Sequence, residues 1–359
     1  MRRIAVTVAF CALVFGALGE RALPLSLTVG TPWRRPPLPA SLSGITWAGG
    51  TNYYAVSDDS FTGEVGLYPM TLELASNGLS VVSCSIPSPT NRIQLAKAYD
   101  LEAVVFDAAN GTVWAADESR HAVREYRLSD GAVLRALPLP DDLRHTRANL
   151  GIESLALSAD GKTLWTCTEE ALPCDGARSS PTNGTTVRLL KYVRPTVHGD
   201  FALAESFPYT TDAWCQAHDF RGKGRRGVSG LCALPDGSLL VLERELSFGG
   251  SNPLTALSTA SLFFAIYRVD PTTDGTRCCG TAAKMAAPHT GGARRCASGI
   301  RKEKLASGGG NVFASGNYEG ICLGPCLPDG KWSVLLVSDA GDGASPPYVL
   351  PMSLSFTQP

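Results

Sequence analysis

Acidic residues recur along this chain at the two ends of one repeated pattern. The pattern occurs five times and begins at Ser43, Glu102, Glu153, Ser229 and Glu319. Each copy starts with Glu or Ser followed by a small residue, and it runs through an apolar stretch to a glycine-containing turn. A second apolar stretch then leads to closing acids. The closing acids include Asp58, Asp59, Asp117, Glu118, Glu169, Glu243 and Asp339. Carboxylates that gather must share protons, pair with basic groups or bind a hard cation.

Each copy has the sequence of a β-hairpin. Asn-Gly or Asp-Gly dipeptides stand at 110–111, 160–161, 236–237 and 329–330, and Gly49-Gly50 serves the first copy. Such dipeptides suit tight turns, and apolar and β-branched residues flank them. Because an antiparallel hairpin pairs residues equidistant from its turn, Glu102 should lie opposite position 119 and Glu153 opposite position 168. The acids of each copy are therefore expected at one end of its hairpin.

The repeat predicts an all-β fold, a β-propeller. The copies begin at positions 43, 102, 153, 229 and 319, so their spacings are 59, 51, 76 and 90 residues. The shorter spacings approach the period of a four-stranded blade, and the longer ones leave room for further blades or insertions. We expect six, possibly seven, blades in a single domain over 41–359, with an irregular, loop-like insertion at about 271–311.

Blades around a common axis would bring the acidic hairpin ends to one face of the molecule. Oxygen ligands in flexible geometry suit calcium, so a bound Ca²⁺ is our preferred interpretation. Turn chemistry alone accounts for Asp160, Asp236 and Asp329, but not for the acids at the opposite hairpin ends. The candidate metal ligands are Asp58, Asp59, Glu102, Asp117, Glu118, Glu153, Glu319 and Asp339.

The first 19 residues have the layout of a secretory signal, with Arg2 and Arg3 before an apolar run and small residues before a cleavage point. We expect a secreted protein, or a periplasmic one in a bacterium, and an extended proline-rich lead-in over 20–40. An oxidising compartment permits disulfides among the remaining cysteines, whose pairing the sequence leaves open. The apolar run is shorter than a bilayer-spanning helix requires. We expect no stable membrane span after the signal is cleaved.

The charge balance excludes one large class of partner. The chain has 32 Lys and Arg against 33 Asp and Glu, a net charge of −1. Nucleic-acid binding depends on a surplus of basic residues facing phosphates, so we expect no nucleic-acid partner. We also expect a small-molecule substrate and a monomeric protein.

The repeated residues resemble the phytase-like family, described as having an esterase-like activity of phytase. The matching stretches are SGI and SDDS, DLEAV and ADES, RANLGIE and SADGKTL, GVSGL and LPDGSLLVLERE, and NYEGICLGP and LLVSD, in order from about 41 to 340. The resemblance implies a β-propeller whose acids form an active site for hydrolysis of phosphoric esters. Leu150 stands where similar chains often have Arg, which removes one candidate phosphate contact.

Phosphoric-ester hydrolysis would give the repeated acids catalytic roles. The candidate catalytic residues are Glu102, Glu153, Glu319, Glu169 and Glu243, with a metal-bound or carboxylate-activated water as the nucleophile. Basic residues near the repeat ends could grip a phosphate or pair with a neighbouring acid: Arg92, Lys97, Arg120, Arg147 and Arg244. Two alternatives stay open, a non-catalytic calcium-stabilised propeller that binds a partner, and a calcium-dependent lactonase or carboxylic esterase.

Overall fold

The structure is a computed structural model that describes residues 24–34, 41–58, 65–86, 88–147, 149–214, 223–249, 258–271, 300, 302–340 and 347–356. The predicted signal segment, Asp59 and residues 272–299 of the expected insertion lie outside the described residues. Among the described residues, no helix has the length and hydropathy needed to cross a bilayer.

Five four-stranded antiparallel blades make up the described fold, and a short extra strand joins the last one. Blade 1 contains β3 (Gly44–Trp47), β4 (Asn52–Ser57), β5 (Gly66–Leu74) and β6 (Val81–Ser85). Blade 2 contains β7 (Leu101–Asp107), β8 (Thr112–Asp117), β9 (Ala122–Arg127) and β10 (Val133–Ala136). Blade 3 contains β11 (Ile152–Leu157), β12 (Thr163–Thr168), β13 (Thr186–Val193) and β14 (Ala202–Thr210).

The last two blades have the longest strands. Blade 4 contains β15 (Lys223–Ala233), β16 (Leu239–Phe248), β17 (Ser261–Val269) and β18 (Lys302–Asn311). Blade 5 contains β19 (Asn317–Cys326), β20 (Trp332–Asp339), β21 (Tyr348–Phe356) and β1 (Leu25–Val29), with β2 (Trp33–Arg34) also paired to β21. Two short 3₁₀ turns, η1 (Pro89–Asn91) and η2 (Asp141–His145), lie in connections between blades.

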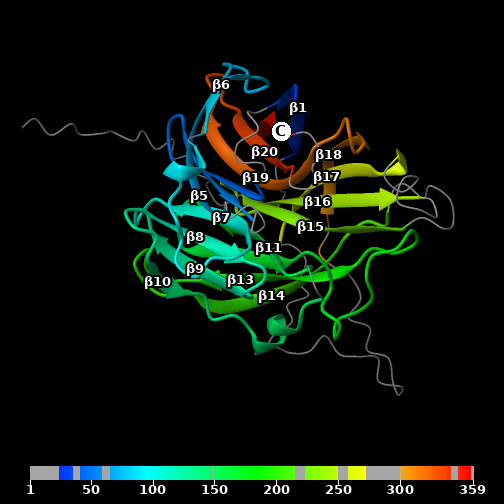
Figure 1. The fold of residues 1–359 in the computed structure, drawn as a ribbon, viewed down its shortest axis with the longest axis horizontal. Helices are drawn as coiled ribbons and strands as arrows, with labels where there is room; N and C mark the ends of the chain where they lie inside the picture. Colours follow the sequence, from blue (N-terminus) through cyan, green and yellow to red (C-terminus); the bar gives the residue numbers. More distant parts are fainter. Residues whose placement is uncertain are drawn as a thin grey trace, which may run out of the picture.

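The blades form a closed ring. The first strands of the blades, β3, β7, β11, β15 and β19, each pack against the first strands of the two neighbouring blades. In Figure 1, β7, β11, β15 and β19 lie towards the middle, and outer strands such as β10 and β14 lie at the rim. Blade 5 joins both ends of the chain, since β1 pairs with β21 from Leu25 opposite Phe356 to Val29 opposite Met352. Part of the expected lead-in over 20–40 therefore belongs to the propeller.

The predicted all-β propeller with four-stranded blades is confirmed, but the expectation of six or seven blades is wrong. Each of the five sequence copies supplies the first two strands of one blade. The wide spacing after Ser229 arises from strands of 9 to 11 residues in blade 4 and from the chain between β17 and β18. Residues 302–311, expected to be irregular, form the regular outer strand β18.

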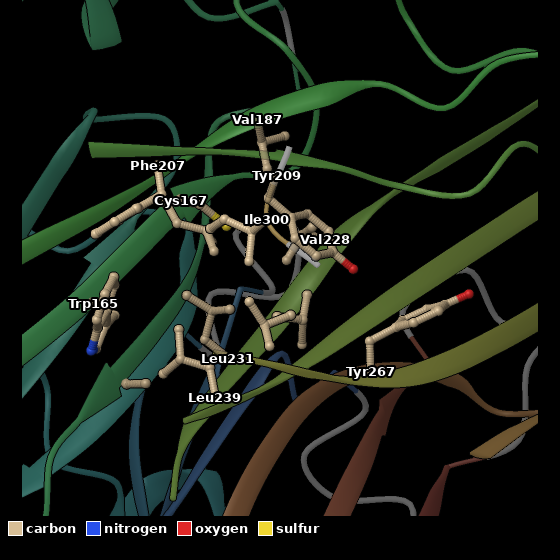
Figure 2. Close-up of a cluster of buried hydrophobic side chains, with 14 of the residues drawn as sticks. Trp165, Cys167, Val187, Phe207, Tyr209, Val228, Leu231, Leu239, Tyr267 and Ile300 are labelled. Atoms are coloured by element: carbon tan, nitrogen blue, oxygen red, sulfur yellow. The ribbon is translucent and has the colours of Figure 1, made fainter. Parts of the chain in front are cut away.

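Apolar side chains of neighbouring blades fill the space between the sheets. One such cluster joins blades 3 and 4 and includes Trp165, Phe207, Leu231 and Leu239, as Figure 2 shows. The rings of Trp165 and Phe207 lie 5.8 Å apart. Burying a side chain of this kind contributes roughly 1.5–3 kcal/mol, so the blades stabilise one another through these contacts.

The cysteines of the described chain do not form disulfide cross-links with one another. Cys167, Cys174, Cys232 and Cys322 are free thiols. No disulfide joins two cysteines within the part of the chain that the structure describes, so the expected disulfides are not found there.

A recurrent irregularity positions the first residue of four repeat copies. The pairing between the first and second strands shifts by one residue at Glu102, Glu153, Ser229 and Glu319. A β-bulge of this kind re-aims a side chain and bends the strand. The small residue that follows lets adjacent first strands approach closely, because a Cβ added at Gly320 would lie 3.0 Å from the Cα of Gly44. Acid, bulge and small residue thus form one structural unit at the axis.

Candidate functional site

The starts of the five repeat copies surround the propeller axis. The first three residues of every copy line one small cavity, at 43–45, 102–104, 153–155, 229–231 and 319–321. Its volume is about 10 Å³, close to the space that one water molecule needs. The predicted convergence of the repeat on one centre is therefore present.

Three carboxylates, one of which lines this cavity, form a compact group of oxygen donors. Asp58 follows β4, Asp100 precedes β7, and Glu102 occupies the bulge of β7. One oxygen from each lies within 4.8 Å of the others. The Glu102 side chain is only 8% exposed, and none of the described residues donates a hydrogen bond to it. One oxygen of Asp58 is also buried without a hydrogen-bond partner.

Burial and mutual repulsion disfavour the charged forms of these acids. Burial, followed by the nearby Asp58 and Asp100, raises the pKa of Glu102 well above its ordinary value, although Arg244 acts in the opposite direction. Burial and the charge of Asp339 raise the pKa of Asp58 to about 7. Without a cation, burial and repulsion therefore favour the protonated forms of Asp58 and Glu102.

Glu153 and Glu118 form a second pair beside the first group. Burial, Glu102 and Glu169 raise the pKa of Glu153 well above its ordinary value. Its side chain lies close to that of Glu118, so the two carboxyl groups can share a proton. The backbone N–H of Gly151 donates to Oε1 of Glu118 at 2.5 Å. The pair is a candidate proton donor or acceptor.

Arg244 is the central cation of the site. Its side chain comes from β16 and donates to Glu319 and, at 2.6 Å, to Oε1 of Glu169. Arg244 is only 6% exposed, and the surrounding carboxylates raise its pKa despite its burial. Asn317 donates to Glu319 at 2.9 Å and to Asp339 at 3.4 Å. Because its donors already face carboxylates, Arg244 acts as a counter-charge within the site.

Most of the acids predicted from the sequence meet in this arrangement. The acids that the structure brings together are Asp58, Glu102, Glu118, Glu153, Glu169, Glu319 and Asp339. The basic residue Arg244 also belongs to the group. Their side chains come from all five blades, because Arg244 lies in blade 4.

Two predicted acids lie elsewhere and have other partners. Asp117 accepts hydrogen bonds from the backbone N–H groups of Tyr99 and Arg120, at 3.0 and 3.1 Å, and so holds the turn after β8. Glu243 lies between blades 3 and 4, where it accepts from Arg226 and Lys302, both at 2.7 Å. It also accepts from the hydroxyl of Tyr209. Asp117, predicted as a metal ligand, and Glu243, predicted as a catalytic residue, thus have these other partners, although the charge of Asp100 still acts on Asp117.

Three other predicted basic residues, Arg147, Arg120 and Lys97, have different surroundings. Arg147 donates to the backbone carbonyls of Ala171 and Gly176 and so ties two loops together. The Arg120 guanidinium lies over the ring of Tyr99, 4.9 Å from its centroid. Lys97 is exposed and forms no ion pair with the described residues. Alternation of strand faces separates Arg244, which points to the axis, from its neighbour Glu243.

The sequence did contain a signal for the site residues that were missed. Extending each copy by two residues gives the stretches SLSGI, DLEAV, GIESL, GVSGL and NYEGI. Their first residues are Ser41, Asp100, Gly151, Gly227 and Asn317. Ser41 donates to Asp339 at 2.6 Å, and a Cβ at Gly227 would lie 2.5 Å from Cγ of Glu169. Residues at these positions contact the acids of the site. The functional repeat therefore begins two residues before the Glu or Ser with which each copy was first defined.

The fold and the site together define a five-bladed β-propeller with an acidic centre on its axis. A family model, phytase-like with the description "esterase-like activity of phytase", matches residues 39–340. The chain belongs to this phytase-like family. No curated protein matches the chain.

Solved structures give weak overall similarity. A chain of the hydrazine synthase of Kuenenia stuttgartiensis is 10% identical, with 83% of this chain and 77% of that chain covered and a TM-score of 0.35. A chain of a nidogen/laminin complex is 10% identical, with coverages of 69% and 89% and a TM-score of 0.33. A protein from Lactobacillus plantarum is 9% identical, with coverages of 88% and 84% and a TM-score of 0.32.

Proposed function

We propose that this protein hydrolyses phosphoric esters with the help of a calcium ion held by Asp58, Asp100 and Glu102. The observation that carries the proposal is the group of three carboxylate oxygens within 4.8 Å of one another. Membership of a family described by an esterase-like activity of phytase supports the substrate class.

The donor set fits calcium by its chemistry. All three donors are carboxylates, and Ca²⁺ takes six to eight oxygen ligands at about 2.3–2.6 Å. Two ligands on opposite sides of such an ion are therefore up to about 5 Å apart, which accommodates the observed spacing. Glu102 is suited to bind a cation, because it is buried and accepts no hydrogen bond from the described residues.

The chain's own residues would divide the chemistry between them. A bound calcium ion would supply positive charge against the phosphoryl oxygens and lower the pKa of an attacking water. Burial and neighbouring acids raise the pKa of Glu153, which favours its protonated form, so it could give a proton to the leaving oxygen with Glu118 beside it. Glu169 and Glu319 hold Arg244 in place beside the reacting groups.

Arg225 is the basic residue best suited to contact a substrate phosphate. Its side chain is 25% exposed and lies 3.5 Å from Oε2 of Glu169. Its Nη1 also donates to the backbone carbonyl of Asn149 at 3.3 Å. Unlike Arg244, Arg225 thus has a partly exposed guanidinium at the edge of the acidic centre, and a guanidinium can bind phosphate with two parallel hydrogen bonds.

Phosphate release tests this function. With calcium, we expect the purified protein to release phosphate from phytate or simple phosphomonoesters, or an alcohol from phosphodiesters, and to stop when EDTA is added. Asp100→Asn should lower the rate about 100-fold, since even indirect partners of a metal site cost 10- to 100-fold. Asp329→Asn changes an exposed turn acid and serves as the matched control. Activity unaffected by EDTA or by Asp100→Asn would refute the proposal.

A second candidate function is a non-catalytic propeller that uses calcium for stability and binds a partner. The observation in its favour is the small axial cavity, which admits about one water molecule and no substrate. A calcium-dependent rise in melting temperature without turnover of phosphate esters, acyl esters or lactones would favour this function. Cleavage of acyl esters or lactones alone would identify the site as that of a carboxylic esterase or lactonase.

A further inference from the structure

A groove on the outer part of blade 2 has a lining that the proposed hydrolysis does not use. Its volume is about 550 Å³, within the range of small-molecule sites. The lining comes from the turn after β8, the start of β9, the end of β10 and η2. The residues are Arg120, His121, Ala122, Val123, Arg124, Ala136, Leu137, Pro138, Leu139 and Arg144.

The groove concentrates positive charge in a chain whose net charge is −1. Three arginines and a histidine line it, and no carboxylate does. Arg120 has no carboxylate in ion-pair contact among the described residues. Arg144 is 72% exposed. Among the described residues it pairs only with the exposed Asp141 at 3.7 Å, a contact that contributes little. Arg124 differs, because Asp117 lies behind it at 3.5 Å.

Apolar residues form the other half of the lining. Val123 and Leu137 are buried, and they belong to the apolar cluster between blades 2 and 3. Ala136, Pro138 and Leu139 continue this surface. A ligand that fits the groove would therefore meet cationic heads and an apolar wall at the same time.

The turn that carries the cationic side is held in place. Asp117 accepts from the backbone N–H of Arg120, and the N–H of His121 donates to the carbonyl of Glu118 at 3.0 Å. His121 has φ +46°, a conformation that few non-glycine residues adopt, and its buried Nδ1 has no hydrogen-bond partner among the described residues. Buried polar atoms normally find a partner, so a ligand atom in the groove would complete this one.

We infer that this groove binds a small organic anion with an apolar body of about the size of one aromatic ring. Arg120 and Arg144 would bind its anionic head, and the surface around Val123 and Leu137 would receive its body. This inference does not depend on hydrolysis at the acidic centre.

Calorimetric titration with phenylphosphonate tests the inference, because its carbon–phosphorus bond resists ester hydrolysis. The titration is run in EDTA, so that a metal at the acidic centre cannot contribute. Benzyl alcohol supplies the body without the charge, inorganic phosphate supplies the charge without the body, and benzoate tests a planar anionic head. We expect phenylphosphonate to bind about tenfold more tightly than benzyl alcohol or inorganic phosphate. Comparable binding of benzoate would extend the ligand class to carboxylates.

The variants locate the binding. Replacing Arg120 and Arg144 together by Gln should weaken phenylphosphonate binding about tenfold. Arg127→Gln, an exposed arginine on the same strand β9 that pairs with Asp130, should leave binding unchanged. Glu102→Gln should also leave it unchanged, which separates the groove from the acidic centre. No binding by the unaltered protein, equal binding of benzyl alcohol, or loss of binding in Glu102→Gln alone would overturn the inference.

Discussion

At the scale of single residues, the acidic centre contains carboxylates whose negative charge the surrounding protein offsets only in part. Glu102 and Glu153 are buried, and neighbouring acids raise the pKa of each. Arg244 offsets part of this repulsion, but its donors are directed at Glu169 and Glu319. A divalent cation would remove the remaining repulsion, so protons and calcium should compete for this group.

This competition gives a prediction for the metal-free protein. A carboxyl group whose pKa is higher in the folded state stabilises the fold below its unfolded pKa, and this stability is lost as the pH rises through the folded pKa. In EDTA, the melting temperature should therefore fall as the pH rises from about 5 to 8, a window that includes the pKa of about 7 for Asp58.

Glu102→Gln should remove part of that loss. We expect it to raise the melting temperature of the metal-free protein at pH 8 by roughly 2 °C, about 1 kcal/mol of stability, and to change it little at pH 5. Thermal unfolding at the two pH values measures the effect. A lower melting temperature for the variant at pH 8 would show that Glu102 stabilises the fold as a carboxylate.

At the scale of the strand and hairpin, the repeat unit was the most predictable feature. The glycine turns and flanking apolar residues identified all five hairpins, and the acids lie within a residue or two of the predicted pairing. The pairing differs because a bulge intervenes at the repeat acid and because the turn after β7 spans more than two residues, as the bond from Gly111 N to Asp107 O indicates. Pairing arithmetic contains no information on either feature.

Long-range contacts explain what the sequence could not supply. Asp117 and Glu118 are adjacent acids, but backbone donors hold the first while the second faces Glu153. Asp100 was missed because it lies before its strand, outside the hairpin as first defined. Each of the five copies corresponds to one blade. The wide spacing after Ser229 could reflect an extra blade or an insertion, and only the strand lengths of blade 4 distinguish the two.

The close approach of first strands gives a prediction at this scale. In Gly320→Ala, the new Cβ would lie 2.7 Å from Cγ2 of Val337 and 3.0 Å from Cα of Gly44. We expect a loss of about 1–3 kcal/mol in the free energy of unfolding, measured by denaturant titration. Gly310→Ala in β18 is the control, since the new Cβ there meets only the hydroxyl of Ser315. Equal stability of the two variants would argue against tight packing at the axis.

At the scale of the whole molecule, closure of the ring joins residues from the two ends of the described chain. Strand β1 covers the edge of β21, and Leu25 is buried in the apolar cluster between blades 4 and 5. Only this pairing completes the fifth four-stranded blade. The acidic centre draws on all five blades, so its geometry should depend on closure.

Removal of β1 tests this dependence. A chain that begins at residue 41 should be less stable than one that begins at residue 24, by on the order of 3 kcal/mol, because burial of Leu25 and its neighbours is lost. Thermal unfolding compares the two chains. An unchanged melting temperature would mean that the ring does not need the N-terminal strand.

Calcium binding tests the central claim most directly. We predict that calorimetric titration of the EDTA-treated and dialysed protein with calcium shows saturable binding. Asp100→Asn and Glu102→Gln should each abolish or greatly weaken it, and Asp329→Asn should retain it. Absence of calcium binding in the unaltered protein, or unchanged binding in Asp100→Asn, would contradict the assignment of the acidic centre as a calcium site.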